Sequence, residues 1–224
     1  MLKRHWIYFF FSLIFVVSCA PRITPPEVYS GKHITLADIS AMHSDVRAIK
    51  ATFSITLKQI SQSMTGEGLV LLKEGVFHEP PLLHLKVYAF GNIILDVISR
   101  SGIVTTNPPM NIERYDELSN GIIYAFLWWR DIEGGSLKTD EDSFIISSKD
   151  RKIWLDRKTL LPLKQELLLG KERVNISYSK PRNNGKIWYP SLMKIADKKN
   201  EVYLDIRHID FKPNINDKDF LFPS

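Results

Sequence analysis

The sequence predicts a mainly β protein (α+β), in which a strongly curved antiparallel sheet forms an incomplete barrel with helices across its concave face. About ten apolar segments, each five to eleven residues long, follow one another from Ala51 to the end of the chain. Short turns such as Asn184-Gly185 separate them, which favours antiparallel neighbours, because a parallel crossover needs about a dozen residues or more. Two stretches with helical spacing, near 35–49 and 116–131, interrupt this pattern. So many strands must close or curl strongly to protect their edges.

The first predicted helix begins after Thr35. This residue is a good N-cap, and Asp38 follows three positions later, as in a capping box. Apolar residues then recur at steps of three and four as far as residue 49. At Ala51 the period changes to two, which predicts a half-buried strand. The apolar residues of that strand are Phe53, Ile55 and Leu57.

Strand patterns dominate the rest of the chain. The predicted strands are GEGLVLLKEG, LLHLKVYAF, NIILDVISR, SFIISS, KIWLDR, LPLKQELLL, ERVNISYS, IWYPSLMKIA and EVYLDIRHIDF. Alternation places Asp96 and Asp205 on the face opposite Leu95 and Leu204.

The second predicted helix covers residues 116–131. Asp116 and Glu117 favour a helix start electrostatically, and residues 122–129 carry no charge. A helix that is apolar nearly all round should be buried. One face would carry Leu118, Ile122, Phe126 and Trp129.

The amino terminus has the layout of a secretory signal peptide. Lys3 and Arg4 precede an uncharged run from Ile7 to Val17, which is too short for a spanning helix of about 20 residues. Cys19, the single cysteine, follows in the sequence VVSC. This resembles the lipobox of bacterial lipoproteins, which implies that the thiol carries diacylglycerol and that the chain is cut before Cys19 and acylated there. The alternative is an uncleaved membrane anchor with an incidental cysteine.

The predicted domain organisation has three parts. Residues 1–18 are the signal peptide, 19–33 the lipidated terminus with a Pro-rich tether, and 34–224 a single folded domain. In many Gram-negative lipoproteins an Asp after the cysteine retains the protein at the inner membrane. Because Ala20 stands there, the resemblance implies a lipid-anchored protein at the bacterial outer membrane, facing the periplasm.

Composition and motifs argue against several function classes. Removing Lys3 and Arg4 with the signal peptide lowers the formal charge from +5 to about +3, too little to favour nucleic-acid binding. The histidines form no metal-binding pair, and no G-x-S-x-G elbow or P-loop is present. We therefore expect no catalytic residues, no metal site and no cofactor.

Several segments resemble the lipoprotein-carrier superfamily of the Lol system, LolA and LolB. KATFSITLK and GEGLVLLKEG resemble its first two strands, and HLKVYAFGNIILDV resembles the LolB hairpin that protrudes with a large apolar residue before a glycine. IWLDRKTLLPLKQEL resembles a superfamily hairpin, and NINDKDFLFP its last strand and tail. The resemblance covers residues 34–224 and is closest in layout to LolB, because of Cys19. The predicted loop residue is aromatic here, whereas LolB has an aliphatic one.

The resemblance implies an apolar cavity that holds the acyl chains of other lipoproteins. The expected partners are those chains, a periplasmic LolA-like carrier and outer-membrane lipid, and the protein is expected to be a monomer. Phe90 would enter the membrane, and Gly91 would permit the tight turn. The residues expected to line the cavity are Phe53, Ile55, Leu57, Leu69, Leu71, Leu83, Leu85, Val87, Ile93, Leu95, Val97, Ile122, Phe126 and Trp129.

Two other functions remain open at this point. A sensory or scaffolding envelope lipoprotein could use the same half-barrel to bind a lipid or a protein partner. A structural lipoprotein with a filled core would have the same apolar residues as ordinary packing, so the sequence alone does not separate it from the other two.

Overall fold

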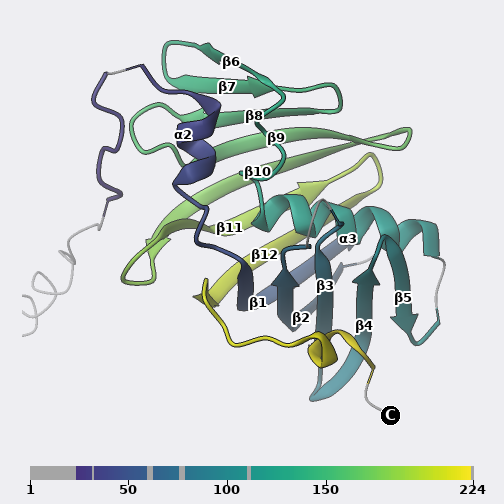
Figure 1. The fold of residues 1–224 in the computed structure, drawn as a ribbon. Coiled ribbons are helices and arrows are strands. Elements are labelled where there is room, and N and C mark those ends of the chain that lie inside the picture. The colour runs from purple at the N-terminus through teal and green to yellow at the C-terminus, as the bar shows by residue number, and fades with distance from the viewer. Residues whose placement is uncertain (1–23, 32, 60–62, 76–78, 110–111, 223–224) are drawn as a thin grey trace, which may run out of the picture.

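A single sheet of twelve antiparallel strands forms the body of the protein (Figure 1). The computed structural model describes residues 24–31, 33–59, 63–75, 79–109 and 112–222. Along the sheet the order is β5-β4-β3-β2-β1-β12-β11-β10-β9-β8-β7-β6. The strands are β1 (Ala48–Gln59), β2 (Ser63–Lys73), β3 (Leu82–Ala89), β4 (Asn92–Arg100), β5 (Ile103–Asn107), β6 (Ser136–Thr139), β7 (Ser143–Ser147), β8 (Arg151–Asp156), β9 (Pro162–Leu169), β10 (Glu172–Asn183), β11 (Trp188–Ala196) and β12 (Asn200–Asp210).

Two meanders make up this sheet, the first from β1 to β5 and the second from β6 to β12, and the strands β1 and β12 join them. β1 pairs with β12 over ten residue pairs, from Lys50–Asp210 to Gln59–Asn200. The edge strands β5 and β6 do not pair with each other, so the barrel stays open. The long helix α3 (Ile112–Phe126) connects these two edges and crosses the concave face between the meanders (Figure 1). The predicted incomplete barrel is therefore confirmed.

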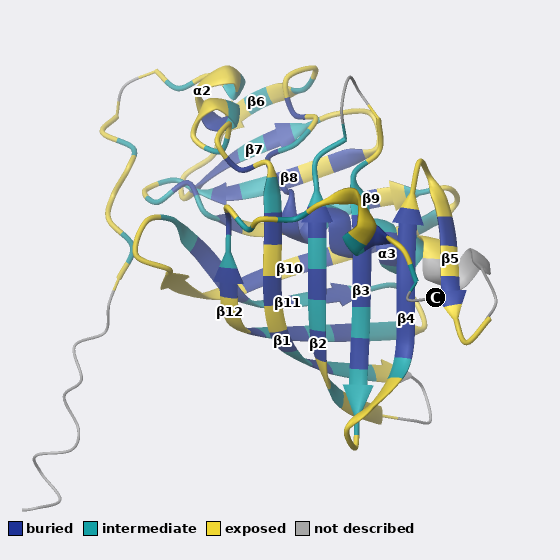
Figure 2. Cartoon of the chain, turned by 60° about the horizontal axis from the view of Figure 1, so that its bottom comes forward, coloured by how far each residue is buried: buried dark blue, intermediate teal, exposed yellow. Residues whose placement is uncertain are grey.

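The inner face of the first meander is set by its register. Phe53 lies opposite Gly68, which pairs with Val87, which in turn pairs with Leu95. A Cβ added at Gly68 would lie 2.1 Å from the Phe53 ring, so the absent side chain leaves room for that ring. These strands are buried along much of their length, whereas the tip of the β3–β4 hairpin is exposed (Figure 2).

Three boundaries differ from the prediction. The first helix, α2, covers only Leu36–Ala41, although its predicted capping box between Thr35 and Asp38 is present. α3 ends at Phe126, so Trp128 and Trp129 lie in the turn after the helix, both buried. The edge strands β5 and β6 have no counterpart among the predicted strands.

Side chains from β8, β9 and β10 hold the carboxyl end of α3. Arg151 donates to the carbonyl oxygens of Trp128 at 2.5 Å and Arg130 at 2.7 Å, and to Gln165 Oε1 at 2.8 Å. Gln165 Nε2 donates to the Tyr124 oxygen at 3.0 Å, and the Tyr178 hydroxyl donates to the Ala125 oxygen at 3.1 Å. Helices leave their last carbonyls without partners, and a cation there also interacts favourably with the helix dipole. This buried network fixes α3 over the sheet.

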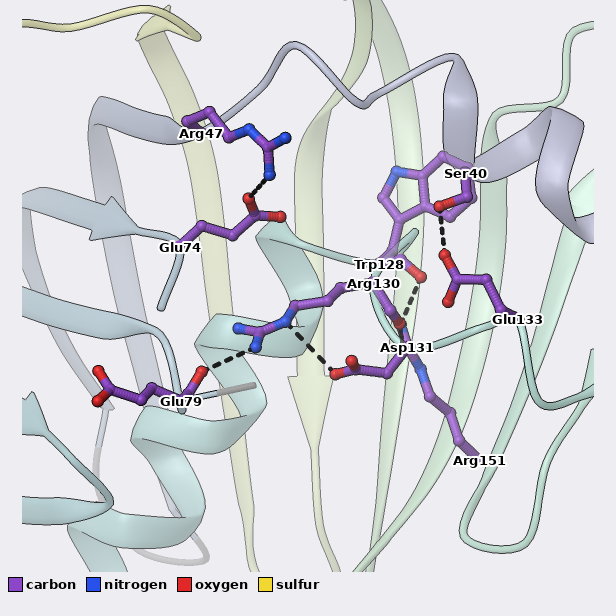
Figure 3. Close-up of polar contacts among 9 residues, drawn as sticks. All are labelled: Ser40, Arg47, Glu74, Glu79, Trp128, Arg130, Asp131, Glu133 and Arg151. Atoms are coloured by element: carbon purple, nitrogen blue, oxygen red, sulfur yellow. Dashed lines mark hydrogen bonds and ion pairs between the residues drawn. The ribbon is translucent and has the colours of Figure 1, made fainter. Parts of the chain in front are cut away.

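The segment after α3 links the two meanders. Arg130 Nη2 donates to the Glu79 carbonyl oxygen at 2.9 Å, before β3 (Figure 3). Glu133 accepts a hydrogen bond of 2.5 Å from Ser40 Oγ of α2. The position of α2 is thus coupled to that of α3.

His43 provides a pH-dependent contribution to stability. Its ring stacks on Trp129 at 4.2 Å and meets the Trp128 ring edge-on at 4.9 Å. Burial lowers the pKa of His43 from 6.5 to about 4. Since the unfolded chain then binds the proton more tightly, stability is lost as the pH falls from 6.5 towards 4, by up to about 3 kcal/mol.

We expect His43→Phe to reduce the difference between the free energies of unfolding at pH 7 and pH 4.5, measured by urea unfolding. An unchanged slope would contradict this assignment.

A second buried histidine ties the chain's carboxyl-terminal segment to the convex face. His84 and Asp96 form a buried pair with Nε2 and Oδ1 2.7 Å apart, and His84 Nδ1 donates to the Asp219 carbonyl oxygen. Asp219 belongs to the short 3-10 helix η1 (Asp217–Phe220), whose Phe220 is buried. The prediction that Asp96 faces away from Leu95 is confirmed.

Candidate functional site

An apolar cavity of about 260 Å³ lies where the first half of α3 faces the ends of strands from both meanders. Its apolar lining comes from β1, β2, β4, α3 and β10–β12. The apolar lining residues are Leu57, Met64, Ile94, Leu95, Leu118, Val174, Ile195 and Val202. The polar residues at its edge are Lys58, Glu117, Asp197, Asn200 and Glu201.

A bulge in the β3–β4 pair shapes one wall. The pairing shifts between Val87–Leu95 and Tyr88–Ile93, so Ile94 is an extra residue without a direct partner. A bulge redirects side chains locally. Ile94 and Leu95 both line the cavity, whereas Ile93 is 48% exposed.

Ten of the fourteen predicted lining residues lie on the predicted inner side, and they form two groups. Leu57 and Leu95 line the cavity itself. The others in these groups are buried beyond it, in the core. These buried residues are Phe53, Ile55, Leu83, Leu85, Val87, Val97, Ile122 and Phe126.

The remaining four predicted residues need correction. Leu69 pairs with Thr52 and Leu71 with Lys50, which places both on the face opposite Phe53. Val70 and Leu72 take the inner face instead, and because the run LVLL is apolar throughout, alternation could not fix its phase. Ile93 shares the outward direction of Tyr88 because of the bulge. Trp129 lies against His43 rather than at the cavity, because α3 ends before it.

Six of the apolar lining residues were missing from the predicted lining. Leu118 was predicted on the same helix face as Ile122, but not as a lining residue. Met64 pairs directly with Leu57. The second meander contributes Val174, Ile195 and Val202. Their alternation with polar residues predicts an inner face, but only the strand pairing shows that this face meets α3. Ile94 depends on the bulge.

Glu201, at the edge of the cavity, is held by neighbouring side chains of β11 and β12. Lys194 Nζ lies 2.5 Å from Glu201 Oε1, and the Tyr203 hydroxyl donates to Glu201 Oε2 at 2.6 Å. The hydrogen bond from Lys194 is the main reason that the pKa of Glu201 lies below its usual value. Lys58 Nζ lies 4.9 Å from the centre of the Tyr203 ring. Together these groups place a polar edge on an apolar interior, which suits a ligand with an apolar part and a solvated head.

Phe90 stands at the tip of the β3–β4 hairpin, four and five residues before Ile94 and Leu95 of the cavity wall. The side chain is fully exposed, with a relative exposure of 103%. Phe90 and Gly91 form a two-residue turn between the paired Ala89 and Asn92, with φ angles of 52° and 78°. Positive φ is expected at both central residues of such a turn, but it is unusual for a bulky residue. An exposed aromatic residue in this strained position satisfies no packing requirement of the fold.

The described residues contain no group of three or more His, Cys, Asp or Glu residues that could hold a metal ion. No helix within the described ranges is long and apolar enough to cross a membrane. The predicted lipidation site, Cys19, lies outside the described residues.

Ile94→Trp tests whether the cavity is the binding site. The larger ring would occupy space between β4 and α3, so we expect binding of a fluorescent single-chain acyl probe to weaken by at least about tenfold, or about 1.4 kcal/mol. Ile103→Trp, on the exposed edge strand β5, is the matched control and should leave binding unchanged. Equal affinity in both variants would show that the probe binds elsewhere.

Comparisons with known proteins agree on the architecture. No protein-family model matches the sequence, and no curated protein matches it. A LolA superfamily protein from Nitrosomonas europaea is similar in structure, with a TM-score of 0.59 and 13% identity over 85% of this chain and 99% of that one. A putative outer membrane lipoprotein-sorting protein domain from Vibrio parahaemolyticus has a TM-score of 0.51 and 14% identity, over 83% and 95% of the two chains.

A third similar structure is a DUF1329 family protein from Desulfovibrio piger. Its TM-score is 0.51 and its identity 11%, over 83% of this chain and 95% of that one. The similarity extends over nearly the whole length of each of these three chains. The chain therefore has the same fold as this LolA superfamily protein and this lipoprotein-sorting protein domain.

Proposed function

We propose that this protein is an outer-membrane lipoprotein, anchored through Cys19, that takes acyl chains of other lipoproteins into its half-barrel and helps to insert them in the outer membrane. The observation that carries the proposal is that one hairpin contains both the exposed Phe90 and two residues of the cavity wall. A fully exposed phenylalanine marks the tip of the same hairpin whose Ile94 and Leu95 line the apolar space. A large exposed apolar group at such a place favours contact with a membrane or partner.

The cavity provides what transfer of an acylated protein requires. Exposing each CH₂ group to water costs roughly 0.8 kcal/mol, so an acyl chain needs cover while it crosses an aqueous space. An apolar cavity gives this cover without any chemical step. Passage to the membrane then requires only that the bilayer bind the chains more tightly than the protein does.

The descriptions of the similar structures support the proposed function. One of them is described as an outer membrane lipoprotein-sorting domain and another as a LolA superfamily protein. A LolA-like carrier is the partner expected to deliver cargo to the cavity, at whose edge the paired residues Lys58 and Glu201 lie. Several acyl chains on Cys19 would hold the protein on the bilayer more firmly than one chain.

Depletion of the protein in cells is the direct test. We expect other lipoproteins to accumulate at the inner membrane, measured by membrane fractionation. Mass spectrometry of the purified protein should also find a copurifying acylated ligand. Normal lipoprotein localisation together with a bound lipid would contradict delivery and would favour the lipid-sensing alternative. An empty protein with normal localisation would favour a structural role.

A further inference from the structure

The segment before α2 is attached to the body at a defined place. The backbone amides of Val28 and Tyr29 both donate to the Lys158 carbonyl oxygen, at 2.7 and 3.1 Å. The Tyr29 ring packs edge-on against Phe144 of β7, with ring centres 4.9 Å apart. Glu27 forms an ion pair of 3.3 Å with Lys158. We name residues 27–29 the strap, and the β8–β9 turn with Phe144 its seat.

The strap is held by two backbone hydrogen bonds, one ion pair and the partly buried Tyr29 ring, whose centre lies 5.9 Å from the Arg157 guanidinium. The Glu27–Lys158 pair is largely exposed, and such pairs contribute little to stability. Val28 is itself half-exposed. The seated arrangement can therefore exchange with a released one without disturbing the sheet, because local segments with few buried contacts open at low cost.

The seat and the Phe90 hairpin lie at opposite extremes of the body. The strap runs past the β8–β9 side at the upper left in both views, whereas the β3–β4 hairpin forms the lower extreme in Figure 2. A folded body of this size is about 40 Å across. The two features thus lie on different sides of the molecule.

The length of the chain between Cys19 and the strap limits how the body can turn on the membrane. About eight residues separate Cys19 from Glu27, and they span at most about 30 Å when fully extended. With the strap seated, the hairpin cannot point straight at the bilayer that holds Cys19, because the seat would then stand about 40 Å above it. With the strap released back to Thr35, about sixteen residues span up to about 55 Å, which is enough.

We propose that the strap sets the orientation of the body on its membrane. Seated, it directs Phe90 and the cavity entrance away from the anchoring bilayer, towards the aqueous side from which cargo arrives. Released, it lets the body turn so that the hairpin meets the bilayer. This inference rests on the proposed function, since it requires the anchor at Cys19 and membrane contact by Phe90.

The test uses the full-length acylated protein in liposomes of phosphatidylethanolamine and phosphatidylglycerol, with hydrogen exchange of the β3–β4 hairpin amides as the readout. Tyr29→Ala removes the ring from its seat. An insertion of about ten Gly and Ser residues before Glu27 instead lengthens the reach by up to about 33 Å and keeps the seat. We expect both to slow hairpin exchange at least about tenfold relative to the unmodified protein. Tyr29→Phe, which keeps the ring, and the same insertion after Ser224 should behave like the unmodified protein.

Each outcome bears on a different claim. Protection of the hairpin in the unmodified protein, as strong as with the insertion, overturns the strap and leaves the proposed function standing. A hairpin that stays unprotected in every variant overturns membrane contact by Phe90, and with it both the inference and the delivery mechanism. Protection in the Tyr29→Ala and inserted proteins alone supports the orienting strap.

Discussion

Arg151→Met is expected to lower the free energy of unfolding by about 3–5 kcal/mol. Methionine has a similar length but no hydrogen-bond donor, so the buried oxygens of Trp128, Arg130 and Gln165 would each lose a partner. A buried acceptor left without a donor costs about 1–3 kcal/mol. Burial lowers the pKa of Arg151 to about 10. The guanidinium therefore remains charged and keeps all its hydrogen-bond donors at physiological pH.

Urea unfolding followed by circular dichroism measures this loss. Arg173→Met on the exposed side of β10 is the matched control, and we expect it to change stability by no more than about 0.5 kcal/mol. A loss below about 1 kcal/mol in Arg151→Met would mean that the end of α3 finds other donors. Since domains of this kind are stable by about 5–15 kcal/mol in total, the expected loss would leave little reserve.

Phe90→Glu is expected to reduce transfer of acyl chains from the protein to vesicles by at least about tenfold, while acyl binding to the protein is unchanged. The substitution removes an apolar ring worth about 1.5–3 kcal/mol on burial. It also places a charge where the bilayer disfavours one. Stability should hardly change, because the side chain contacts solvent on all sides.

The measurement is the rate at which a fluorescent acylated peptide leaves the loaded protein for acceptor vesicles. Phe90→Leu keeps an apolar side chain and should retain most of the rate. Ile103→Glu, at another exposed apolar position, is the control for adding charge and should leave the rate unaltered. Unchanged transfer in Phe90→Glu would place membrane contact elsewhere on the surface.

The sequence was most informative where local pattern determines structure. Phe53 and Ile55 alternate with polar residues, and both lie on the predicted inner face. The Thr35–Asp38 capping box and the outward direction of Asp96 were also predicted from neighbouring residues alone. The antiparallel arrangement of successive strands was predicted from their short turns.

Where tertiary structure decides, the sequence was not sufficient. The face taken by Leu69 and Leu71 depends on pairing with β1, and Ile94 reaches the cavity through a bulge that no local signal marks. Trp129 fits the helical period of α3, but the helix ends at Phe126. The role of Arg151 depends on carbonyl oxygens about twenty residues earlier in the chain, so an isolated arginine in a strand gave no indication of it.

The pairing of β1 with β12 governs how this protein can fold. On the side away from β2, residues 48–59 pair with residues 200–210, so the centre of the sheet forms by closing a loop of nearly the whole domain. Contacts between such distant residues slow folding, because chain entropy must be lost before they form. A chain that stops before residue 200 would expose the edges of β1 and β11 in the middle of the sheet, and unpaired edges promote aggregation. Synthesis of the last strand is therefore the event that commits both halves to one structure.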